Sequence, residues 1–179
     1  MIRLRVVGVF YDANFPFAGI GNIKDLLDAA VLKEKGNFSY ATTVKFKVVD
    51  RKQKAINSLL GFCNRLNGKG IPKSLGAQKR DVGYYKLFES TSVERDSVTV
   101  HAWQYYVIRG EQVISNYWNG AELDGTKKLP DVSPAVPKPY VGSTPGFTPF
   151  DTMALRDGDE VVWRNVSIVR NPQTEPVYF

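Results

Sequence analysis

The chain has 179 residues, of which 43% are hydrophobic and 23% charged, and these fractions match those of ordinary globular proteins. Such a composition excludes a wholly disordered, collagenous or coiled-coil protein, and the length favours a single domain. One cysteine, Cys63, excludes an intramolecular disulfide and a thiolate metal cage, and one histidine, His101, excludes a histidine-cluster metal site. The formal net charge of +6 permits an anionic partner without requiring one.

The first part of the chain predicts a strand, a loop and an amphipathic helix. Residues 2–11 alternate and then become apolar on both faces, which is typical of a strand that enters a core. Residues 12–21 contain Asn, Pro and Gly and are expected to form a loop. Asn22 then supplies a helix N-cap and Gly36 a stop. Between them lie the apolar residues that we expect to face a sheet, namely Leu26, Leu27, Ala30 and Val31.

The next part predicts a second strand and a second helix. Residues 38–40 and 42–50 alternate between polar and apolar side chains and predict a strand in which Phe46 points inward. From residue 51 to residue 66, apolar residues recur at helical spacing, so a second helix is expected there. Cys63 falls on its apolar stripe, where a small buried residue is expected rather than a nucleophile.

The second half predicts strands interrupted by one long irregular segment. Residues 83–90 form a candidate strand, and residues 98–109 form a longer one whose hairpin partner is residues 112–118. Residues 119–152 carry most of the prolines and show no periodicity. Residues 160–169 are expected to be the last strand. This mixed order of strands and helices indicates an α+β domain.

Three segments, in the right order along the chain, resemble one protein family. They are residues 23–30 in the first expected helix, residues 102–107 in the Trp-centred strand, and residues 155–163 around an Asp-Gly-Asp turn. Together they resemble the β-grasp domain that is similar to the C-terminal domain of transcobalamin. Ile108 and Arg109 depart from the family's usual Asn-Gly continuation.

The resemblance implies a β-grasp-like mixed sheet crossed by the amphipathic helix, with the second helix and a long Pro-rich loop inserted. Residues 1–170 are expected to form a single domain with insertions at about 51–82 and 119–152. Residues 171–179 are expected to form an extended tail. Transcobalamin binds cobalamin, but that function belongs to a two-domain protein, and a shared fold does not transfer it. No cofactor is therefore expected.

The residues show no pattern typical of an enzyme. His101 has no Ser, Cys or Asp at a distinctive spacing, and the acidic residues of 157–160 lack the further oxygen ligands of a calcium loop. We therefore expect a non-catalytic binding or protein-interaction module, whose partner is a protein or a small ligand. Large aromatic side chains build cores as well as contact surfaces. On the second interpretation, the contact residues are Trp103, Tyr105, Tyr117, Trp118 and Tyr140.

A basic nucleic-acid-associated protein is the alternative. Its surface would extend from Lys45 to Arg80 and centre on Lys45, Lys47, Arg51, Lys52 and Lys54. A solvated face has the same composition, and binding of single-stranded nucleic acid asks for aromatic platforms among the cations. Phe46 is the only aromatic residue between Lys45 and Lys54, and its expected inward orientation weighs against this alternative.

The sequence predicts neither a signal peptide nor a membrane-spanning segment. The apolar run at the N-terminus is short and ends at Asp12, and no run approaches the roughly 20 residues of a spanning helix. If Met1 is the natural start, a cytoplasmic location without a membrane partner is expected.

Overall fold

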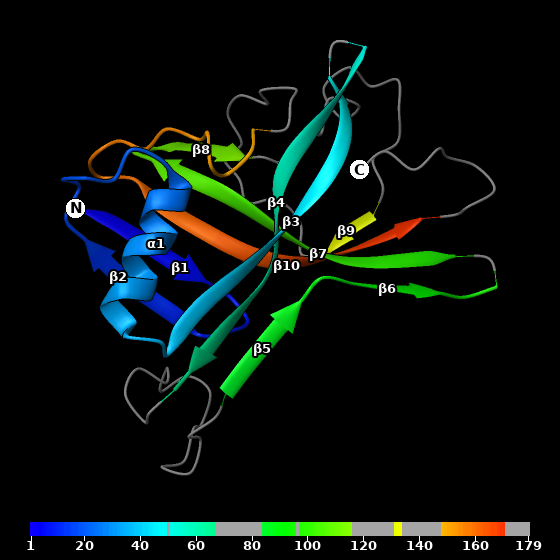
Figure 1. Ribbon diagram of the computed structural model, residues 1–179, viewed down its shortest axis with the longest axis horizontal. Helices are drawn as coiled ribbons and strands as arrows, with labels where there is room; N and C mark the ends of the chain where they lie inside the picture. The colour runs from blue at the N-terminus through cyan, green and yellow to red at the C-terminus, as the bar shows by residue number, and fades with distance from the viewer. Residues whose placement is uncertain (50, 67–83, 96, 116–130, 134–147, 171–179) are drawn as a thin grey trace.

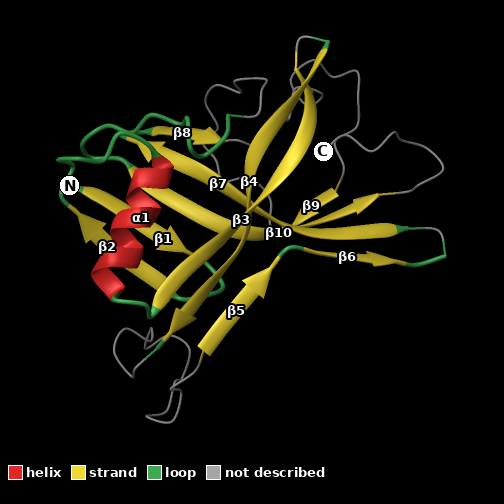
Figure 2. Cartoon of the chain, in the orientation of Figure 1, coloured by secondary structure: helices red, strands yellow, loops and turns green. Residues whose placement is uncertain are grey.

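The computed structural model describes residues 1–49, 51–66, 84–95, 97–115, 131–133 and 148–170. These residues form one α-helix and ten β-strands, arranged in a seven-stranded sheet and a three-stranded sheet (Figures 1 and 2). We call them the large sheet and the small sheet. The mixture of helix and sheets confirms the α+β character that the sequence predicted.

The N-terminal strand is shorter than predicted, because the chain turns back early. β1 (Ile2–Val6) pairs antiparallel with β2 (Tyr11–Phe15), so residues 12–15 belong to a strand and not to a loop. The turn at residues 7–10 includes Gly8 and Phe10 at φ values of 96° and 56°. The sequence did not predict this turn, because its residues include Val and Phe, and a positive φ is uncommon outside glycine.

The first predicted helix is present as α1 (Ile23–Glu34). A capping box starts it: the Asp25 amide donates to the Asn22 side chain, and the Asp25 carboxylate accepts from the Asn22 amide. Lys35 and Gly36 at positive φ end it. The helix contacts β2 and β3, and its buried side chains are Ile23, Leu26, Leu27 and Ala30.

The strand β10 (Glu160–Arg170) lies at the centre of the large sheet. It runs parallel to β1 and antiparallel to β7 (Val98–Arg109), which confirms the two long strands predicted in the second half. β6 (Ser90–Val93) and β8 (Gln112–Ser115) both pair with β7, so the predicted hairpin after residue 109 is confirmed as far as residue 115. The order is β2-β1-β10-β7-β6.

The Pro-rich segment contains more regular structure than its sequence indicated. The short strand β9 (Asp131–Ser133) pairs with β10 inside the range 119–152 that was predicted to be a loop. Residues 116–130 and 134–147 lie outside the described residues, as does the predicted tail at 171–179.

The small sheet overturns the second predicted helix. It consists of β3 (Phe38–Val49), β4 (Lys52–Arg65) and β5 (Tyr84–Phe88), and β4 occupies the segment predicted to be helical. The register shifts where Ala41 pairs with Gly61 and Thr42 pairs with Leu59, which leaves Leu60 as the extra residue of a β-bulge. Leu59 and Phe62, three apart, consequently both reach the core and imitate helical spacing.

The two sheets share one aromatic core. Phe62 of β4 contacts Trp103 of β7 and Trp163 of β10, with ring centroids 4.8 and 5.6 Å apart. Tyr105 and Phe150 lie against the same Trp163 ring at 5.2 and 5.8 Å. All four contacts are edge-to-face, the arrangement that aromatic quadrupoles favour. The small sheet is therefore anchored where β4 passes over this cluster.

Gly61, beside the bulge, allows β5 to approach β4. A Cβ at this position would lie 2.5 Å from the Leu87 carbonyl oxygen and 2.8 Å from the Phe88 Cα. Both are backbone atoms, so the neighbour cannot yield by changing rotamer. We expect Gly61→Ala to lower the free energy of unfolding by about 1–3 kcal/mol, measured by urea denaturation. The exposed Gln53→Ala variant on the same strand is the control, and equal midpoints for the two variants would contradict the prediction.

Candidate functional site

Two of the predicted aromatic contact residues lie in the core. Trp103 is 7% exposed and Tyr105 is 1% exposed. The Trp103 indole Nε1 donates to the Leu87 carbonyl at 3.0 Å, and the Tyr105 hydroxyl donates to the Thr148 carbonyl. Burial raises the pKa of Tyr105, so its hydroxyl remains a protonated donor. These two side chains hold the core together; the other three predicted contacts lie outside the described residues, namely Tyr117, Trp118 and Tyr140.

The two reactive side chains that the sequence singled out, Cys63 and His101, lie on strands of different sheets. Cys63 is buried on β4, as expected for a structural cysteine. His101 lies within β7, where it is opposite Ser90 on one side and Ser167 on the other. No three His, Cys, Asp or Glu residues of the described part are placed to hold a metal ion. None of its helices is both long and apolar enough to cross a membrane.

The outer half of the β3–β4 hairpin exposes apolar side chains. We call residues 44–56 the arm; Figure 1 shows the paired ends of β3 and β4 projecting away from α1. Val44 and Phe46 are 57% and 63% exposed, so the predicted inward orientation of Phe46 is wrong. In the register, Val44 lies opposite Asn57 and Phe46 opposite Ala55, which makes this side of the ribbon uncharged.

The arm also gathers the predicted nucleic-acid-binding cations. Its sequence holds five basic residues and one acidic residue, a net charge of 5 − 1 = +4. Arg51, Lys52 and Lys54 are exposed, whereas Lys45 forms an ion pair with Glu89 at 2.5 Å. Lys47 lies directly opposite Lys54 in the register. The structure therefore brings the five predicted residues together on one hairpin. Three of them, Arg51, Lys52 and Lys54, are exposed cations.

Contacts from both strands of the hairpin fix the root of the arm, around Lys45 and Asn57, to the rest of the protein, which we call the body. The Lys45–Glu89 ion pair is partly buried, with side-chain exposures of 23% and 17%. The Glu89 amide also donates to the Leu60 carbonyl at 2.7 Å. Next to the arm, the Asn57 amide side chain donates to the Asp151 carboxylate at 3.4 Å. The arm consequently starts from a defined position, which reduces the entropy cost of presenting its outer face to a partner.

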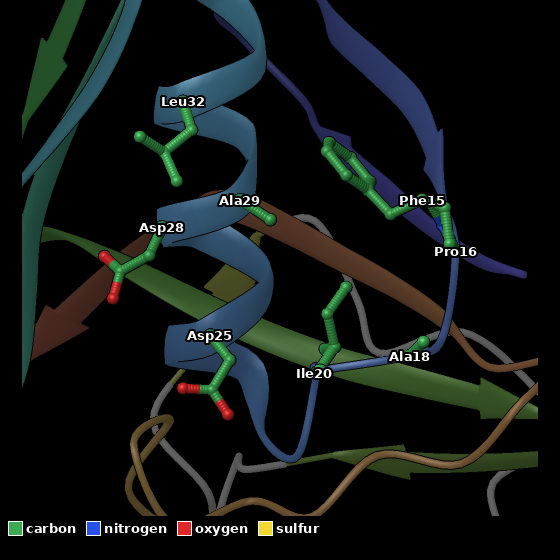
Figure 3. Close-up of a pocket in the computed structure, with 9 residues that line it drawn as sticks. Phe15, Pro16, Ala18, Ile20, Asp25, Asp28, Ala29 and Leu32 are labelled. Atoms are coloured by element: carbon green, nitrogen blue, oxygen red, sulfur yellow. The ribbon is translucent and has the colours of Figure 1, made fainter.

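A hollow of about 360 Å³ lies beside α1 (Figure 3). The helix forms one wall, and the segment that joins β2 to α1 forms the other. Its lining is mainly apolar and consists of Phe15, Pro16, Ala18, Gly19, Ile20, Ala29 and Leu32, together with the carboxylates of Asp25 and Asp28. Leu32 is 78% exposed, so this apolar surface is open to solvent.

The two carboxylates beside the hollow differ in their partners. Asp28 pairs with Lys24 at 2.5 Å and accepts a hydrogen bond from the Tyr40 hydroxyl. Burial raises the pKa of Asp28, but the hydrogen bonds from Lys24 and Tyr40 together lower it by more than burial raises it. The pKa of Asp28 therefore lies below its usual value. Asp25 accepts from the backbone amides of Gly21 and Asn22, and no described cation forms an ion pair with it. The hollow is thus apolar, and its border carries these two carboxylates together with Lys24, which pairs with Asp28, and Lys33, whose Nζ lies 4.8 Å from the centre of the Phe15 ring.

Sequence reasoning found the cations of the arm but missed its exposed apolar side chains, and it missed the hollow altogether. The arm had one signal, a dense run of cations along an alternating strand, but alternation alone cannot say where the core ends. The hollow had none, because its two walls come from a segment predicted to be a loop and from the partly exposed side of a helix.

No protein-family model, curated protein or solved structure matches the chain. The function is therefore inferred from the chemistry of the arm and the hollow.

Proposed function

We propose that this chain is a non-catalytic binding module on a β-grasp-like scaffold, and that the arm binds an acidic protein partner. One observation carries the proposal: Val44 and Phe46 are 57% and 63% exposed on an arm whose net charge is +4. Exposed apolar side chains bordered by polar groups are typical of protein interaction sites. Lys52 and Lys54 lie on the other face of the ribbon and Arg51 at its turn, so their positive charge favours the approach of an acidic partner while the apolar face makes the contact.

The arrangement of the elements supports the β-grasp-like scaffold. The amphipathic helix α1 follows the β1–β2 hairpin and shares one core with β1, β7 and β10. The three segments that carry the family resemblance lie in α1, in β7 and in the turn that leads into β10. β7 and β10 are paired neighbours, so segments scattered along the chain belong to one continuous unit. Such a scaffold would hold the hairpin rigidly at its root.

The chemistry of the exposed face favours a protein over a nucleic acid. Phosphate contacts require cations on the surface that touches the backbone. The face of Val44 and Phe46 carries no charged residue opposite these positions, and Lys45 already binds Glu89. Burying a phenylalanine in a partner contributes about 1.5–3 kcal/mol, which gives the apolar face the larger share of the binding energy.

One observation favours the nucleic-acid alternative, and the test must therefore separate the two. Phe46 is exposed, so it can serve as an aromatic stacking platform for a base. In the sequence, its expected inward orientation had weighed against nucleic-acid binding. Binding to single-stranded DNA would weaken steeply with salt, whereas an apolar protein contact would change little.

The test uses two fluorescein-labelled probes, a 20-residue peptide of glutamate and leucine and the oligonucleotide dT15, with binding followed by anisotropy. We expect the wild type to bind the peptide and Phe46→Thr to weaken this binding by about tenfold or more, since each tenfold corresponds to about 1.4 kcal/mol. Threonine keeps the β propensity of the position. Val93→Thr is the matched control, because Val93 is 76% exposed on β6.

The outcomes differ for each class of partner. Preferential binding of dT15, lost steeply as salt rises and weakened by Lys52→Ser with Lys54→Ser, would establish the nucleic-acid alternative instead. Peptide binding that is equal in wild type and Phe46→Thr would remove the arm as the contact surface. Binding of neither probe at millimolar protein would contradict both functions.

A further inference from the structure

We infer that the acidic partner binds the arm as an extended strand, which adds antiparallel to the outer edge of β3 and in which apolar and acidic residues alternate. The inference rests on the proposed function, because the same arm makes the contact. It adds the binding mode and the sequence pattern of the partner.

The outer edge of β3 presents backbone groups to a partner. The order of the small sheet is β3-β4-β5, and β4 is the one described strand that pairs with β3. Val49 lies opposite Lys52 across a two-residue turn in which Arg51 has a φ of 61°. The pair that flanks such a turn is hydrogen-bonded, and hydrogen-bonded and non-hydrogen-bonded pairs alternate along an antiparallel ladder. Val44 and Phe46 lie an odd number of residues from Val49, so their amides and carbonyls point away from β4.

The same two residues also expose their side chains. Val44 and Phe46 are 57% and 63% exposed, so one added strand would both pair with their backbone and cover their apolar side chains. Their face of the ribbon continues the core. Along β4, Ala55, Asn57 and Leu59 alternate onto that face, and Leu59 is 3% exposed within the core. Apolar side chains of the added strand would therefore extend an existing apolar layer.

The opposite face of the arm supplies the charge. Lys52 and Lys54 are exposed and lie on the face away from Phe46. Neighbouring strands are about 4.8 Å apart, so side chains on this face of an added strand would start about 10 Å from β4, comparable with the Debye length of about 8–10 Å. Acidic residues are favoured at those positions. Because successive side chains of a strand alternate between its faces, the partner should alternate apolar and acidic residues.

The same charge disfavours a second copy of this chain as the added strand. Pairing of two β3 edges about a twofold axis would place both cationic faces on one side of the joined sheet. Each arm carries a net charge of +4, so the two arms would repel each other. The partner is therefore a different, acidic chain.

One experiment changes the protein side of the contact. Val44→Pro removes an amide that points outward, and proline is tolerated at such positions of an edge strand. Val44→Thr is the matched control, because both variants remove the valine side chain and only proline removes the amide. We expect Val44→Pro to bind a fluorescein-labelled 12-residue peptide of alternating valine and glutamate about tenfold more weakly than Val44→Thr, measured by anisotropy. Circular dichroism verifies that both variants are folded.

A second experiment changes the peptide and so does not depend on the folding of a variant. In an antiparallel strand beside β3, the valines opposite Val44 and Phe46 direct their amides to β3, and the glutamate amides point away. N-methylation of all valines should weaken binding to the wild-type chain by about tenfold or more, and N-methylation of all glutamates should leave it within about twofold. A peptide of the same composition with its valines at helical spacing should also bind at least about tenfold more weakly.

Other results overturn the inference in distinguishable ways. Peptide binding that Phe46→Thr weakens, but that is equal for the two N-methylated isomers, excludes the added strand and leaves the proposed function intact. Equal affinities of Val44→Pro and Val44→Thr exclude the outer edge of β3 as the pairing site. Loss of binding on methylating the glutamates instead of the valines overturns the antiparallel orientation. Equal binding of the alternating and helically spaced peptides excludes the sequence pattern.

Discussion

Replacing Trp163 by alanine is expected to lower the free energy of unfolding by about 3–5 kcal/mol. Trp163 is 2% exposed at the centre of the large sheet, and its ring contacts Phe62, Tyr105 and Phe150. These partners come from the small sheet, from β7 and from the segment before β10. Because they belong to three separate elements, no one element can shift to fill the cavity that alanine leaves. Urea denaturation followed by far-ultraviolet circular dichroism measures the loss.

Trp163→Phe is the matched variant. The Trp163 Nε1 has no hydrogen-bond partner among the described residues, so phenylalanine removes part of the ring without breaking a recorded hydrogen bond. It should therefore cost clearly less than alanine. Similar losses for the two variants would show that the aromatic contacts are not what stabilises this part of the core.

Arg109→Ala is expected to destabilise the protein by about 3–5 kcal/mol, the cost of leaving a buried charge unpaired. The Arg109 guanidinium donates to both oxygens of Asp159, from Nε at 2.9 Å and from Nη2 at 2.8 Å. The Asp159 side chain is 1% exposed. Removing the cation leaves a buried carboxylate whose remaining recorded partner is the Arg156 amide at 2.8 Å. This pair connects the end of β7 to the turn that starts β10.

Arg3→Ala is the control for the Arg109 prediction. Arg3 makes a similar two-point contact with Asp12, but those side chains are 44% and 49% exposed. Solvent screens such a pair, so its loss should cost about 0–1 kcal/mol. Equal changes in the urea midpoints of Arg3→Ala and Arg109→Ala would mean that burial does not govern these ion pairs and would contradict the prediction.

The stability of the body bears directly on the arm. Phe62, which lies against Trp163, and Leu60, whose carbonyl accepts from the Glu89 amide, both belong to the inner part of β4. The outer part of the same strand forms one side of the arm. A destabilised core would therefore make the position of the arm's root less well defined. Variants of the binding surface are for this reason best chosen at exposed positions such as Phe46 and Val44.

Elements whose signals are local were predicted well from the sequence. The N-cap at Asn22, the apolar spacing behind it and the stop at Gly36 lie within fifteen residues, and α1 runs between these two signals. The strands β7 and β10 and the turn after Arg109 were likewise recognisable. In each case the pattern and the structure that it specifies involve the same few residues, so propensity and burial agree.

Elements whose pattern is altered by a partner strand were mispredicted. At Leu60 the pairing register of β3 and β4 shifts by one residue, which produces the bulge. Buried side chains along β4 are therefore three residues apart there instead of the two that are usual in a strand. The segment therefore has the apolar spacing of a helix although it is a strand. The early turn at Gly8 is similar, since pairing of β1 with β2 decides it.

By itself, the sequence determined the α+β class, the helix α1, the strands β7 and β10 and the grouping of five cations between Lys45 and Lys54. It could not determine which apolar residues face solvent. Phe46 alternates along its strand like a core residue, and only the tertiary structure shows that the arm extends past the part of the core that would cover it. Exposure depends on residues far away in the chain, whereas alternation, capping and charge are properties of neighbours; that difference is why the scaffold was largely readable in the sequence and the binding surface was not.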